Sequence, residues 1–443
     1  MQKFKVIGGT ELNGIIEPQG SKNEALQIVA SSILVGKILI KNIPKISDVL
    51  KLIEMLEDAG SEIIWENNNS VFINTIKINK EYFKSNKYFT DSEKTRGSLL
   101  FMGPLLARFG IAHIPSTGGD KIGARPIDTH TLGFVKIGAK LFNGKNDNYL
   151  TLDNVITDKE IILDDASVTG TANIIMSSIK NAKNLIIYNS ASETYISQLC
   201  NVLKATGVNI QGAGTNRITL NGHLNFNQNG DHIAEIVTTE HEILPDFIEV
   251  ASFIALAMST KSEITIKNAG VKHLGMTLNM FEKLGCKFEI QEDNVKVLKQ
   301  EKYEIEKMYD GSMMKIHDQP WPMISPDILS VGIVAAMQCE GVVLFHEKMY
   351  EARMFFVDKL IAMGAHIVLC DPHRVVVTGN NWKNKLRARH MTSPDIRAGI
   401  ALVIAALGAD GESIIDNIEQ IDRGYENIEK RLATLGAKIT RVN

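Results

Sequence analysis

Apolar residues recur along this chain in a pattern that predicts buried helices followed by short strands. Four segments are apolar on nearly every face of a helix, at residues 24–35, 247–258, 328–337 and 396–407. A helix that lacks a polar face is buried. Short runs of β-branched and aliphatic residues follow these segments at 38–40, 264–266, 342–344 and 414–415, and such runs favour strands. The pattern therefore predicts helices on the inside and strands on the outside.

An internal repeat is marked by a glycine that stands between an amphipathic helix and an alternating strand. The pattern occurs six times, at glycines 69 to 79 residues apart: Gly60, Gly138, Gly207, Gly285, Gly364 and Gly436. Each glycine fits the left-handed position that follows a helix end. Repetition at a fixed period indicates repeated structural units. We predict two inside-out α/β domains, each of three repeated units with buried helices surrounded by sheets.

The length of the chain agrees with more than one domain. At 443 residues it exceeds the size at which a single core usually divides. We expect the boundary near residues 244–246, between the third and fourth units. The first domain would span 22–243, and the second would combine 1–21 with 244–443. A binding site is expected in the cleft between them.

Composition excludes several classes of protein. Hydrophobic residues make up 44% of the chain, charged residues 22%, and the net charge is −3, so no basic excess exists to bind nucleic acid. The longest charge-free run, 166–179, is shorter than the roughly 18 residues of a membrane span. The amino terminus lacks the apolar core of a signal peptide. These observations favour a cytoplasmic protein without membrane insertion.

Neither metal nor cofactor binding is indicated. The cysteines lie far apart, at Cys200, Cys286, Cys339 and Cys370, so they form no disulfide framework or zinc motif; we expect buried thiols. The 11 histidines have no metal-ligand spacing, and His130 is interpreted as a structural histidine. The glycines at 8–14 open no helix, so they do not form a dinucleotide-binding motif.

Cations lie where several buried helices begin. The Ser, Thr and Asp residues at these positions are N-caps, but Lys22, Arg96 and Arg397 are not explained in this way. A cation beside a helix N-terminus is repelled by the helix dipole, at a cost of about 0.3–1 kcal/mol. A bound anion reverses that sign, because the cation and the helix end then act together. We therefore predict anion sites at these helix starts.

Further charged residues extend this set. Arg353 and Arg423, each taken alone, would be interpreted as partners of a nearby acidic residue in the same helix. Together with the helix starts, they predict a cleft lined by Lys22, Arg96, Arg125, Arg353, Arg397 and Arg423. Such a cleft suits a small molecule that carries phosphate and carboxylate groups. Asp120 and Asp327 would supply carboxylates for proton transfer.

The segment 117–126 carries three glycines around Asp120, Lys121 and Arg125. By itself it fits an ordinary surface turn. Beside an anion-binding cleft it fits a loop that moves over the ligand and delivers a charged side chain. We expect a mobile loop at 115–126, carried by the first domain.

Four motifs give the chain its resemblance to a known family. Residues 21–24, 103–110, 118–126 and 421–425 resemble those of the UDP-N-acetylglucosamine 1-carboxyvinyltransferases, and the resemblance runs from residue 3 to residue 441. It implies transfer of the enolpyruvyl group from phosphoenolpyruvate to the sugar 3-hydroxyl, with release of phosphate, at the start of peptidoglycan precursor synthesis. It implies no cofactor and no metal.

The resemblance also implies roles for individual residues. Asp327 would be the base and Asp120 the proton donor to C3. Phosphate would be held by Lys22, Arg125 and Arg423, and the carboxylate would be surrounded by Arg353, Arg397 and Arg423, with Arg96 nearby. Asn23 would contact the sugar. The uridine diphosphate would contact Arg125, Pro126, Ile127, Asp128, Ser167 and Val168.

The chain departs from the family pattern at three positions. Asp120 stands where many members carry the cysteine that fosfomycin alkylates. Because a carboxylate is a far poorer nucleophile toward this epoxide, the resemblance predicts an active but fosfomycin-insensitive enzyme. Asp165 stands where a lysine is often found near the diphosphate, and Thr169 where a glycine is common. Two alternatives are a non-catalytic UDP-sugar-binding paralogue and the related shikimate-phosphate enolpyruvyl transferase.

Overall fold

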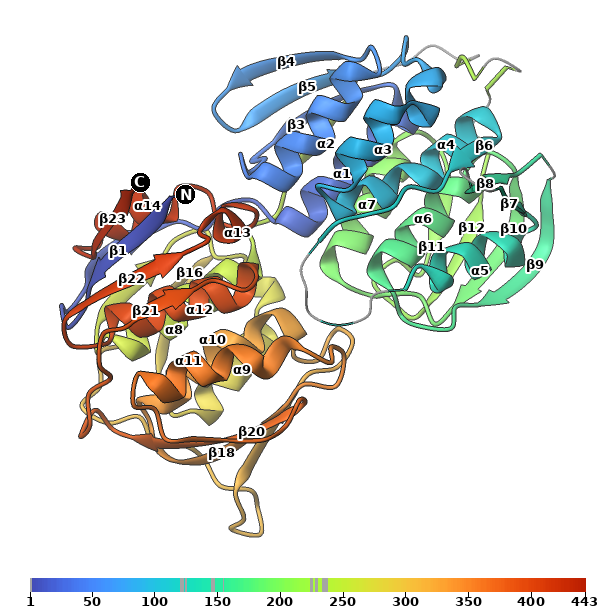
Figure 1. The fold of residues 1–443 in the computed structure, drawn as a ribbon. Coiled ribbons are helices and arrows are strands. Elements are labelled where there is room, and N and C mark those ends of the chain that lie inside the picture. Colours follow the sequence, from blue (N-terminus) through green and yellow to red (C-terminus); the bar gives the residue numbers. More distant parts are fainter. Residues whose placement is uncertain are drawn as a thin grey trace. The chain divides into compact units, whose positions relative to one another are not determined.

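The chain forms two compact units, seen in Figure 1. The computed structural model describes residues 2–119, 123, 126–144, 148–153, 155–223, 226, 227, 230–232 and 238–443. Unit 1 is made mainly of Met1–Gln19 and Pro245–Asn443, and unit 2 of Gly20–Gly119 and Arg125–Leu244. The chain therefore passes between the units at residues 19–20 and again at residues 244–245.

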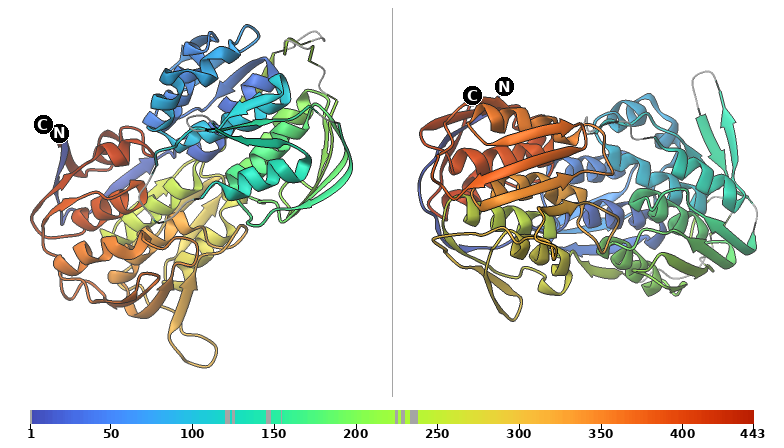
Figure 2. Two further views of the ribbon diagram at one scale, coloured as in Figure 1. Left: turned by 45° about the vertical axis from the view of Figure 1, so that its right-hand side comes forward. Right: turned by 90° about the horizontal axis from the view of Figure 1, so that it is seen from below.

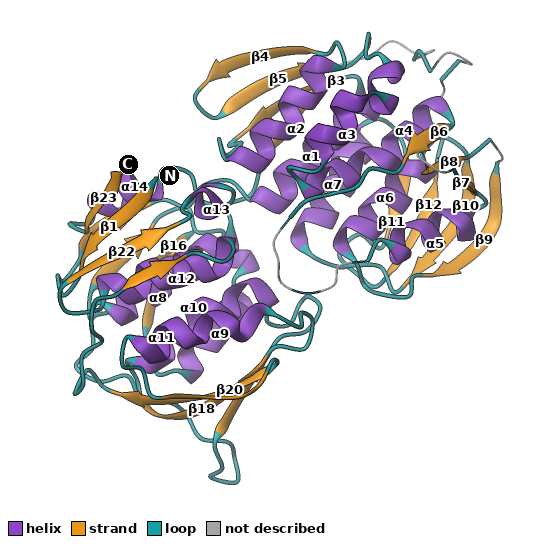
Figure 3. Ribbon diagram, viewed as in Figure 1, coloured by secondary structure: helices purple, strands orange, loops and turns teal. Residues whose placement is uncertain are grey.

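Three buried helices form the centre of unit 2. Helices α1, α4 and α6 pack on one another, and Figure 3 shows the sheets of this unit outside them. The helices of unit 2 are α1 (Lys22–Val35), α2 (Ser47–Asp58), α3 (Asn86–Ser92), α4 (Met102–Phe109), α5 (Asp128–Ile137), α6 (Val168–Ser178) and α7 (Thr194–Ala205), with 3-10 turns η1 (Lys80–Lys84) and η2 (Arg96–Phe101).

Unit 1 repeats this plan with α8, α10 and α12 at its centre, each packed on the other two. Its helices are α8 (Phe247–Ser259), α9 (Gly275–Lys283), α10 (Pro326–Met337), α11 (Val357–Ala362), α12 (Ile396–Leu407), α13 (Glu419–Asp422) and α14 (Ile428–Ala433), with 3-10 turns η3 (Val271–His273) and η4 (Arg353–Phe356). The four helices predicted from apolar runs are confirmed as α1, α8, α10 and α12.

Five of the sheets share one topology. In each, a parallel pair of strands is extended by two antiparallel strands. In unit 2 these sheets are β13-β3-β5-β4 (Thr239–Glu242, Lys37–Lys41, Ser70–Asn74, Glu62–Asn67) and β11-β12-β10-β9 (Asn209–Gln211, Arg217–Asn221, Ala182–Tyr188, Ile156–Ile162). A three-stranded antiparallel sheet, β6-β8-β7 (Ile111–His113, Asn148–Thr151, Lys140–Asn143), takes the place of a third copy.

Unit 1 contains the other three copies. They are β15-β16-β14-β2 (Phe288–Gln291, Asn294–Val297, Glu263–Ile266, Asn13–Ile16), β17-β18-β20-β19 (Met314–His317, Glu340–His346, Arg374–Asn380, Ile367–Asp371) and β21-β22-β1-β23 (His390–Thr392, Glu412–Asp416, Lys3–Ile7, Lys438–Val442). Two strands from the first 16 residues thus belong to sheets of unit 1. Figure 2 shows the blue amino-terminal strand within the red carboxy-terminal sheet.

The six repeat glycines stand where the chain passes from a helix to a strand in each of the six sequence repeats. All six have positive φ, between 88° and 111°, in the region that side chains with a Cβ rarely adopt. The prediction of left-handed glycines is confirmed, and with it the inside-out repeated fold. The helix start predicted at Arg96 differs from the structure: residues 96–101 form the 3-10 turn η2, and the α-helix begins only at Met102.

The cysteines give one correction. Cys200, Cys286 and Cys339 are buried free thiols, but Cys370 is exposed. Cys370 lies on β19, an edge strand, on the same exposed face as Val368, because alternate residues of a strand point to opposite sides. Among the helices that the structure describes, none has the length and apolar character needed to cross a membrane.

Candidate active site

A cluster of charged and polar side chains of unit 1 lies where α10 and α12 begin. We call Asp327, Arg353, Arg397 and Tyr425 the Asp327 cluster. Asp327 stands in the first turn of α10, and its carboxylate accepts from Arg353 Nη2 at 2.9 Å and from Arg397 Nε at 3.3 Å. Arg397 Nη1 donates to the Tyr425 hydroxyl at 3.3 Å. The carboxylate that pairs with Arg353 thus lies on another helix, α10, and not within the helical turn of Arg353 itself.

Local sequence places Arg397 at the start of α12. Asp395 is the N-cap, and its carboxylate accepts the backbone N–H groups of Arg397 and Ala398 at 2.7 and 2.9 Å. Burial alone would lower the pKa of Arg397, but the charge of Asp327 raises it above its usual value. Although its side chain is only 5% exposed, Arg397 therefore stays charged.

Arg353 has hydrogen-bonding capacity that the described residues do not use. Its side chain is 5% exposed, and neither its Nε nor its Nη1 has a hydrogen-bond partner among the residues that the structure describes. Burial opposes its charge, whereas Asp327, Asp395 and Glu347 raise its pKa. A buried donor without an acceptor is costly, by about 1–3 kcal/mol. These N–H groups are therefore suited to an anionic ligand.

A second buried carboxyl pair supports the turn that carries Arg353. Glu347 and Asp318 are both fully buried. Asp318 accepts from the backbone N–H groups of Lys348 and Met349, and Glu347 Oε1 accepts from those of Met349 and Tyr350, at 3.1 and 3.0 Å. Burial, together with the neighbouring Asp318 carboxyl group, raises the pKa of Glu347 well above its usual value. Glu347 therefore holds its proton to a higher pH than an exposed glutamate does.

This pair predicts that unit 1 loses stability as the pH rises. The folded-state pKa of Glu347 lies above its unfolded value of 4.5. Its contribution is therefore complete below pH 4.5 and is lost as the pH rises towards the higher folded-state pKa, because the unfolded chain releases its proton first. We expect the melting temperature to fall between pH 6 and 9, and to fall less in Glu347→Gln, which keeps an acceptor without the titration. Equal slopes in both proteins would contradict this prediction.

Unit 2 contains a cluster at the starts of α1 and α2. Lys22, the first residue of α1, is 7% exposed, and its ammonium group donates to Asp48 Oδ2 at 2.5 Å. Asp48 lies in the first turn of α2, where a carboxylate is favoured by the helix dipole. The charge that Lys22 places beside a helix N-terminus is thus offset within the protein by a carboxylate. The predicted need for a bound anion is correspondingly weaker at this position.

A buried hydrogen-bond network lies at the start of α6. Asn173 Nδ2 lies 2.9 Å from both Leu99 O and His130 Nδ1, and Asn173 Oδ1 accepts from Gly103 N at 2.8 Å. Because Asn173 donates to Nδ1, the proton of a neutral His130 is on Nε2, which donates to Thr169 Oγ1 at 3.0 Å. Burial, aided by the charge of Arg96, lowers the pKa of His130 to about 4. The structural interpretation of His130 is confirmed.

This neutral histidine predicts that unit 2 is destabilised by acid. Its pKa falls from 6.5 to about 4 on folding, so the unfolded chain binds the proton first as the pH drops. The contribution is complete above pH 6.5 and is lost towards pH 4, by about 3 kcal/mol. Hydrogen-exchange protection factors of α6 amides should fall over this range in the wild type and less in His130→Gln. A steeper fall in the variant would contradict the assignment.

The remaining predicted residues occupy various positions. Arg96 is half-buried at the start of η2, and its Nη2 donates to Pro126 O at 3.5 Å. Arg423 Nη1 donates to Gln420 Oε1 at 3.0 Å. Ser167 caps α6 by accepting Gly170 N at 3.1 Å, followed by Val168. The others are half-buried or exposed: Asn23, Pro126, Ile127 and Asp128. Asp120 and Arg125 lie outside the described residues.

The departures from the family pattern have structural partners. Asp165 is exposed, and its Oδ2 accepts from Thr129 Oγ1 at 3.1 Å. Thr169 is fixed by His130, as described above. The base of the glycine-rich loop is held by a close approach: Gly118 N lies 3.4 Å from Ser92 O, and a Cβ at Gly118 would lie 1.9 Å from Glu93 O. Only glycine fits that position.

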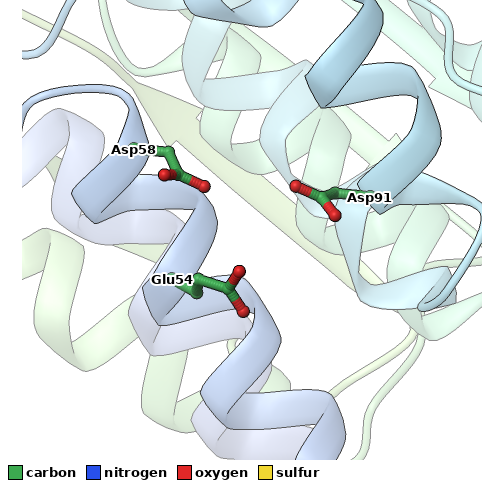
Figure 4. Close-up of side chains that lie close together, drawn as sticks. All are labelled: Glu54, Asp58 and Asp91. Carbon is green, nitrogen blue, oxygen red and sulfur yellow. The ribbon is translucent and has the colours of Figure 1, made fainter.

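A separate group of acidic residues in unit 2 does not form a candidate metal centre. Figure 4 shows Glu54 and Asp58 on α2 facing Asp91 on α3, with ligand atoms within 4.8 Å of one another. Three lysines already form ion pairs with these carboxylates: Lys51, Lys87 and Lys94. Although burial opposes it, hydrogen bonds from these lysines hold the pKa of Asp91 well below its usual value. The group is therefore an ion-pair network that joins α2 to α3.

Three of the residues that sequence reasoning missed show what it could not detect. Asp48 pairs with a lysine 26 positions away, a distance at which no helical or strand periodicity links two residues. Asn173 lies inside an apolar helix, where a buried amide is a signal that it has partners. Tyr425 belongs to the 421–425 motif, but its contact with Arg397 depends on how α12 and α13 pack.

Comparisons with known proteins identify the family of this chain. The family model described as EPSP synthase (3-phosphoshikimate 1-carboxyvinyltransferase) matches residues 6–432. Curated relatives named UDP-N-acetylglucosamine 1-carboxyvinyltransferase include those of Bacteroides thetaiotaomicron (46% identical), Porphyromonas gingivalis (45%) and Borreliella burgdorferi (41%). The first two match over the full length of both chains, and the third covers 100% of this chain and 99% of its own.

Solved structures support the fold. The enolpyruvyl transferase NikO from Streptomyces tendae has a TM-score of 0.81 at 17% identity, covering 100% of this chain and 99% of its own. EPSP synthase from Acinetobacter baumannii has a TM-score of 0.71 at 16% identity, covering 100% of both chains. Full-length identity above 40% to the curated relatives distinguishes this chain from those distant fold relatives. The chain belongs to the UDP-N-acetylglucosamine 1-carboxyvinyltransferase branch of the enolpyruvyl transferase family.

Proposed function

We propose that this protein transfers the enolpyruvyl group of phosphoenolpyruvate to the 3-hydroxyl of UDP-N-acetylglucosamine and releases phosphate. This would be the first committed step of peptidoglycan precursor synthesis, in the cytoplasm. Relatives at up to 46% identity carry the name of that activity. The observation that carries the proposal is the Asp327 cluster, where one carboxylate is shared by two buried guanidinium groups. Arg353 Nη1 has no hydrogen-bond partner there among the described residues, and its Nε lies 3.8 Å from Glu347 Oε2, too far for a hydrogen bond.

The proposed chemistry begins with an exchange of partners at Asp327. A carboxylate between two guanidinium groups is a weak base, because both cations favour its ionised form. The carboxylate of phosphoenolpyruvate is an alternative partner for Arg353 and Arg397, with Arg423 completing the site. Binding this substrate would then release Asp327 and raise its affinity for a proton. Asp327 would therefore become a base only when phosphoenolpyruvate, whose C2 the sugar hydroxyl attacks, is bound.

The addition step needs a base at the sugar hydroxyl and an acid at C3 of the enol. The hydroxyl oxygen bonds to C2 as its proton passes to Asp327, and C3 takes a proton from Asp120. In the second step C3 would return a proton to the Asp120 carboxylate, and the C2–O bond to phosphate would break with its electrons leaving on phosphate, which forms the C2–C3 double bond of the enol ether. Lys22 and Arg423 would stabilise the charge on the leaving phosphate. Asp48 would orient Lys22 through their hydrogen bond.

The residues proposed for these steps come from both units. We propose that Lys22, at the start of α1 in unit 2, and the Asp327 cluster of unit 1 serve the same reaction. UDP-N-acetylglucosamine would contact Asn23, and its diphosphate would lie at the start of α6, where Ser167 and Val168 begin the helix. Arg125, Pro126, Ile127 and Asp128 would complete the uridine contacts, and Arg96 would lie near the phosphoenolpyruvate.

A phosphate-release assay tests the proposal. Phosphate should be released from phosphoenolpyruvate only when UDP-N-acetylglucosamine is present. No release with shikimate 3-phosphate is expected, which separates this activity from the one named in the family model. Binding of the UDP-sugar without any phosphate release would instead identify a non-catalytic paralogue.

A further inference from the structure

We propose that Gln19 is a positioning residue for the Arg423–Tyr425 turn, and through Tyr425 for Arg397. Its side-chain amide makes two hydrogen bonds across more than 400 residues of sequence. Gln19 Nε2 donates to Gly424 O at 2.9 Å, and Gln19 Oε1 accepts from Glu426 N at 2.7 Å. One amide thus binds the backbone on both sides of Tyr425, as a neighbouring strand would. The inference rests on the proposed function, because its effect is measured on that reaction.

The residue between these two hydrogen bonds touches the Asp327 cluster. Tyr425 is 1% exposed. Its hydroxyl accepts from Arg397 Nη1 at 3.3 Å and lies 3.0 Å from Ser252 Oγ, which donates to Ile248 O at 2.9 Å. Its ring also lies 5.6 Å from the guanidinium carbon of Arg397. A shift of the backbone at residues 424–426 would therefore move a direct partner of Arg397.

The Arg423–Tyr425 turn also packs closely against the start of α12. A Cβ at Gly424 would lie 2.4 Å from Ile396 Cγ2, which shows that the turn packs directly on the residue before Arg397. Helices α12 and α13 are in contact at this point (Figure 1). The immediate neighbour, Arg423, is one of the residues proposed to bind phosphoenolpyruvate.

Gln19 is itself held rigidly, which a positioning residue requires. Its backbone N–H donates to Glu249 Oε2 at 2.6 Å, and its carbonyl accepts from Asp246 N at 2.8 Å. Glu249 is fully buried, and its Oε1 accepts from Arg431 Nη1 at 2.5 Å. Gln19 is also the residue after which the chain leaves unit 1. The connection between the units is thereby joined to the turn that carries Arg423.

The chain offers a matched control for this arrangement. Gln300 makes the same pair of bonds elsewhere in unit 1: its Nε2 donates to Gly285 O at 2.9 Å, and its Oε1 accepts from Lys287 N at 2.7 Å. That turn carries none of the proposed site residues. Gln300 Nε2 also donates to Lys302 O at 3.2 Å. Gln300→Met therefore removes at least as many hydrogen bonds as Gln19→Met, and both substitutions keep a side chain of similar length.

Steady-state kinetics with phosphoenolpyruvate and UDP-N-acetylglucosamine test the proposal. Small misplacements near reacting groups cost up to about 100-fold, so we expect kcat in Gln19→Met to fall about 10- to 100-fold. Gln300→Met should stay within about twofold of the wild type, since surface changes away from a site have small effects. Equal losses in both variants, or an unchanged kcat in Gln19→Met, would overturn the role.

A double-mutant cycle distinguishes positioning from general loss of structure. If Gln19 acts through Tyr425, Gln19→Met combined with Tyr425→Phe should lose less than the product of the two single losses. If the loss of kcat in the double variant equals the product of the two single losses, action through Tyr425 is refuted. Should Gln19→Met fail to fold, Gln19→Glu replaces it, because the carboxylate keeps the acceptor for Glu426 N and removes the donor to Gly424 O. An unchanged kcat in Gln19→Glu would then count against the donor bond.

A measurement without substrate separates this inference from the proposed function. Hydrogen exchange at the Glu426 amide should speed up in Gln19→Met, because this amide loses its acceptor. If the wild type showed no enolpyruvyl transfer, the proposed function would fail while faster exchange would still support the positioning contact. Unchanged exchange would refute the contact itself.

Discussion

Asp120→Cys should make the protein sensitive to inactivation by fosfomycin, whereas the wild type should keep its activity throughout the same incubation. A thiolate is a strong nucleophile toward the epoxide, and a carboxylate is not. Turnover should survive the change, because a thiol can carry the same proton to C3 that we assign to the carboxylic acid. The measurement is phosphate release after timed incubation with the drug.

Two controls sharpen this experiment. Asp120→Ser removes the carboxyl group without supplying a thiol, so it should lose activity and gain no sensitivity. The wild type already carries one exposed thiol, Cys370, and mass spectrometry of the drug-treated protein identifies which cysteine is alkylated. Time-dependent inactivation of the wild type, or an insensitive Asp120→Cys, would each contradict the assignment of Asp120.

Asp327→Asn should lower kcat by about 10²- to 10⁴-fold, the usual contribution of a general base. The binding of phosphoenolpyruvate should persist or become tighter in the same variant. The reason is that the carboxylate no longer competes with the substrate for Arg353 and Arg397. A fall in kcat without a loss of affinity is the distinguishing result, measured by kinetics and by calorimetric titration.

The control for this variant is Asp371→Asn. Asp371 also pairs with an arginine of unit 1, Arg374, but it contacts no predicted site residue. Its loss should leave kcat unchanged. Asp327→Asn should also lower the melting temperature, since two buried guanidinium groups are left without their carboxylate. A fully active Asp327→Asn would refute the base assignment, whatever its stability.

Local signals in the sequence were sufficient to predict the repeated fold. A glycine at a helix end and an apolar helical period are each decided by a few neighbouring residues, and both recur six times or nearly so. For the same reason the helix starts and their caps were predictable: Asp395 caps α12 and Ser167 caps α6. The helix start predicted at Arg96 was the exception, because Arg96–Phe101 forms a 3-10 turn before the α-helix begins.

The partners of the predicted cations could not be read from the sequence. Lys22 and Arg397 were recognised because they stand in unfavourable positions at helix starts, yet the carboxylates that offset them lie on other helices. Such pairs depend on tertiary packing, which has no period along the chain. The amide of Gln19 is the extreme case, since its two partners lie 405 and 407 residues away.

The central position of β1 in its sheet has a consequence for synthesis on the ribosome. Both neighbours of this strand, β22 and β23, come from the end of the chain. Chain synthesis proceeds at about 5–20 residues per second. The partners of β1 are therefore made roughly 20–80 s after β1 itself, and by then all residues of unit 2 have been synthesised. An unpaired apolar strand invites aggregation, and lysines are a common protection. Lys3 and Lys5, which finally pair with Asp416 and Glu412, would keep the nascent strand soluble until its partners are made.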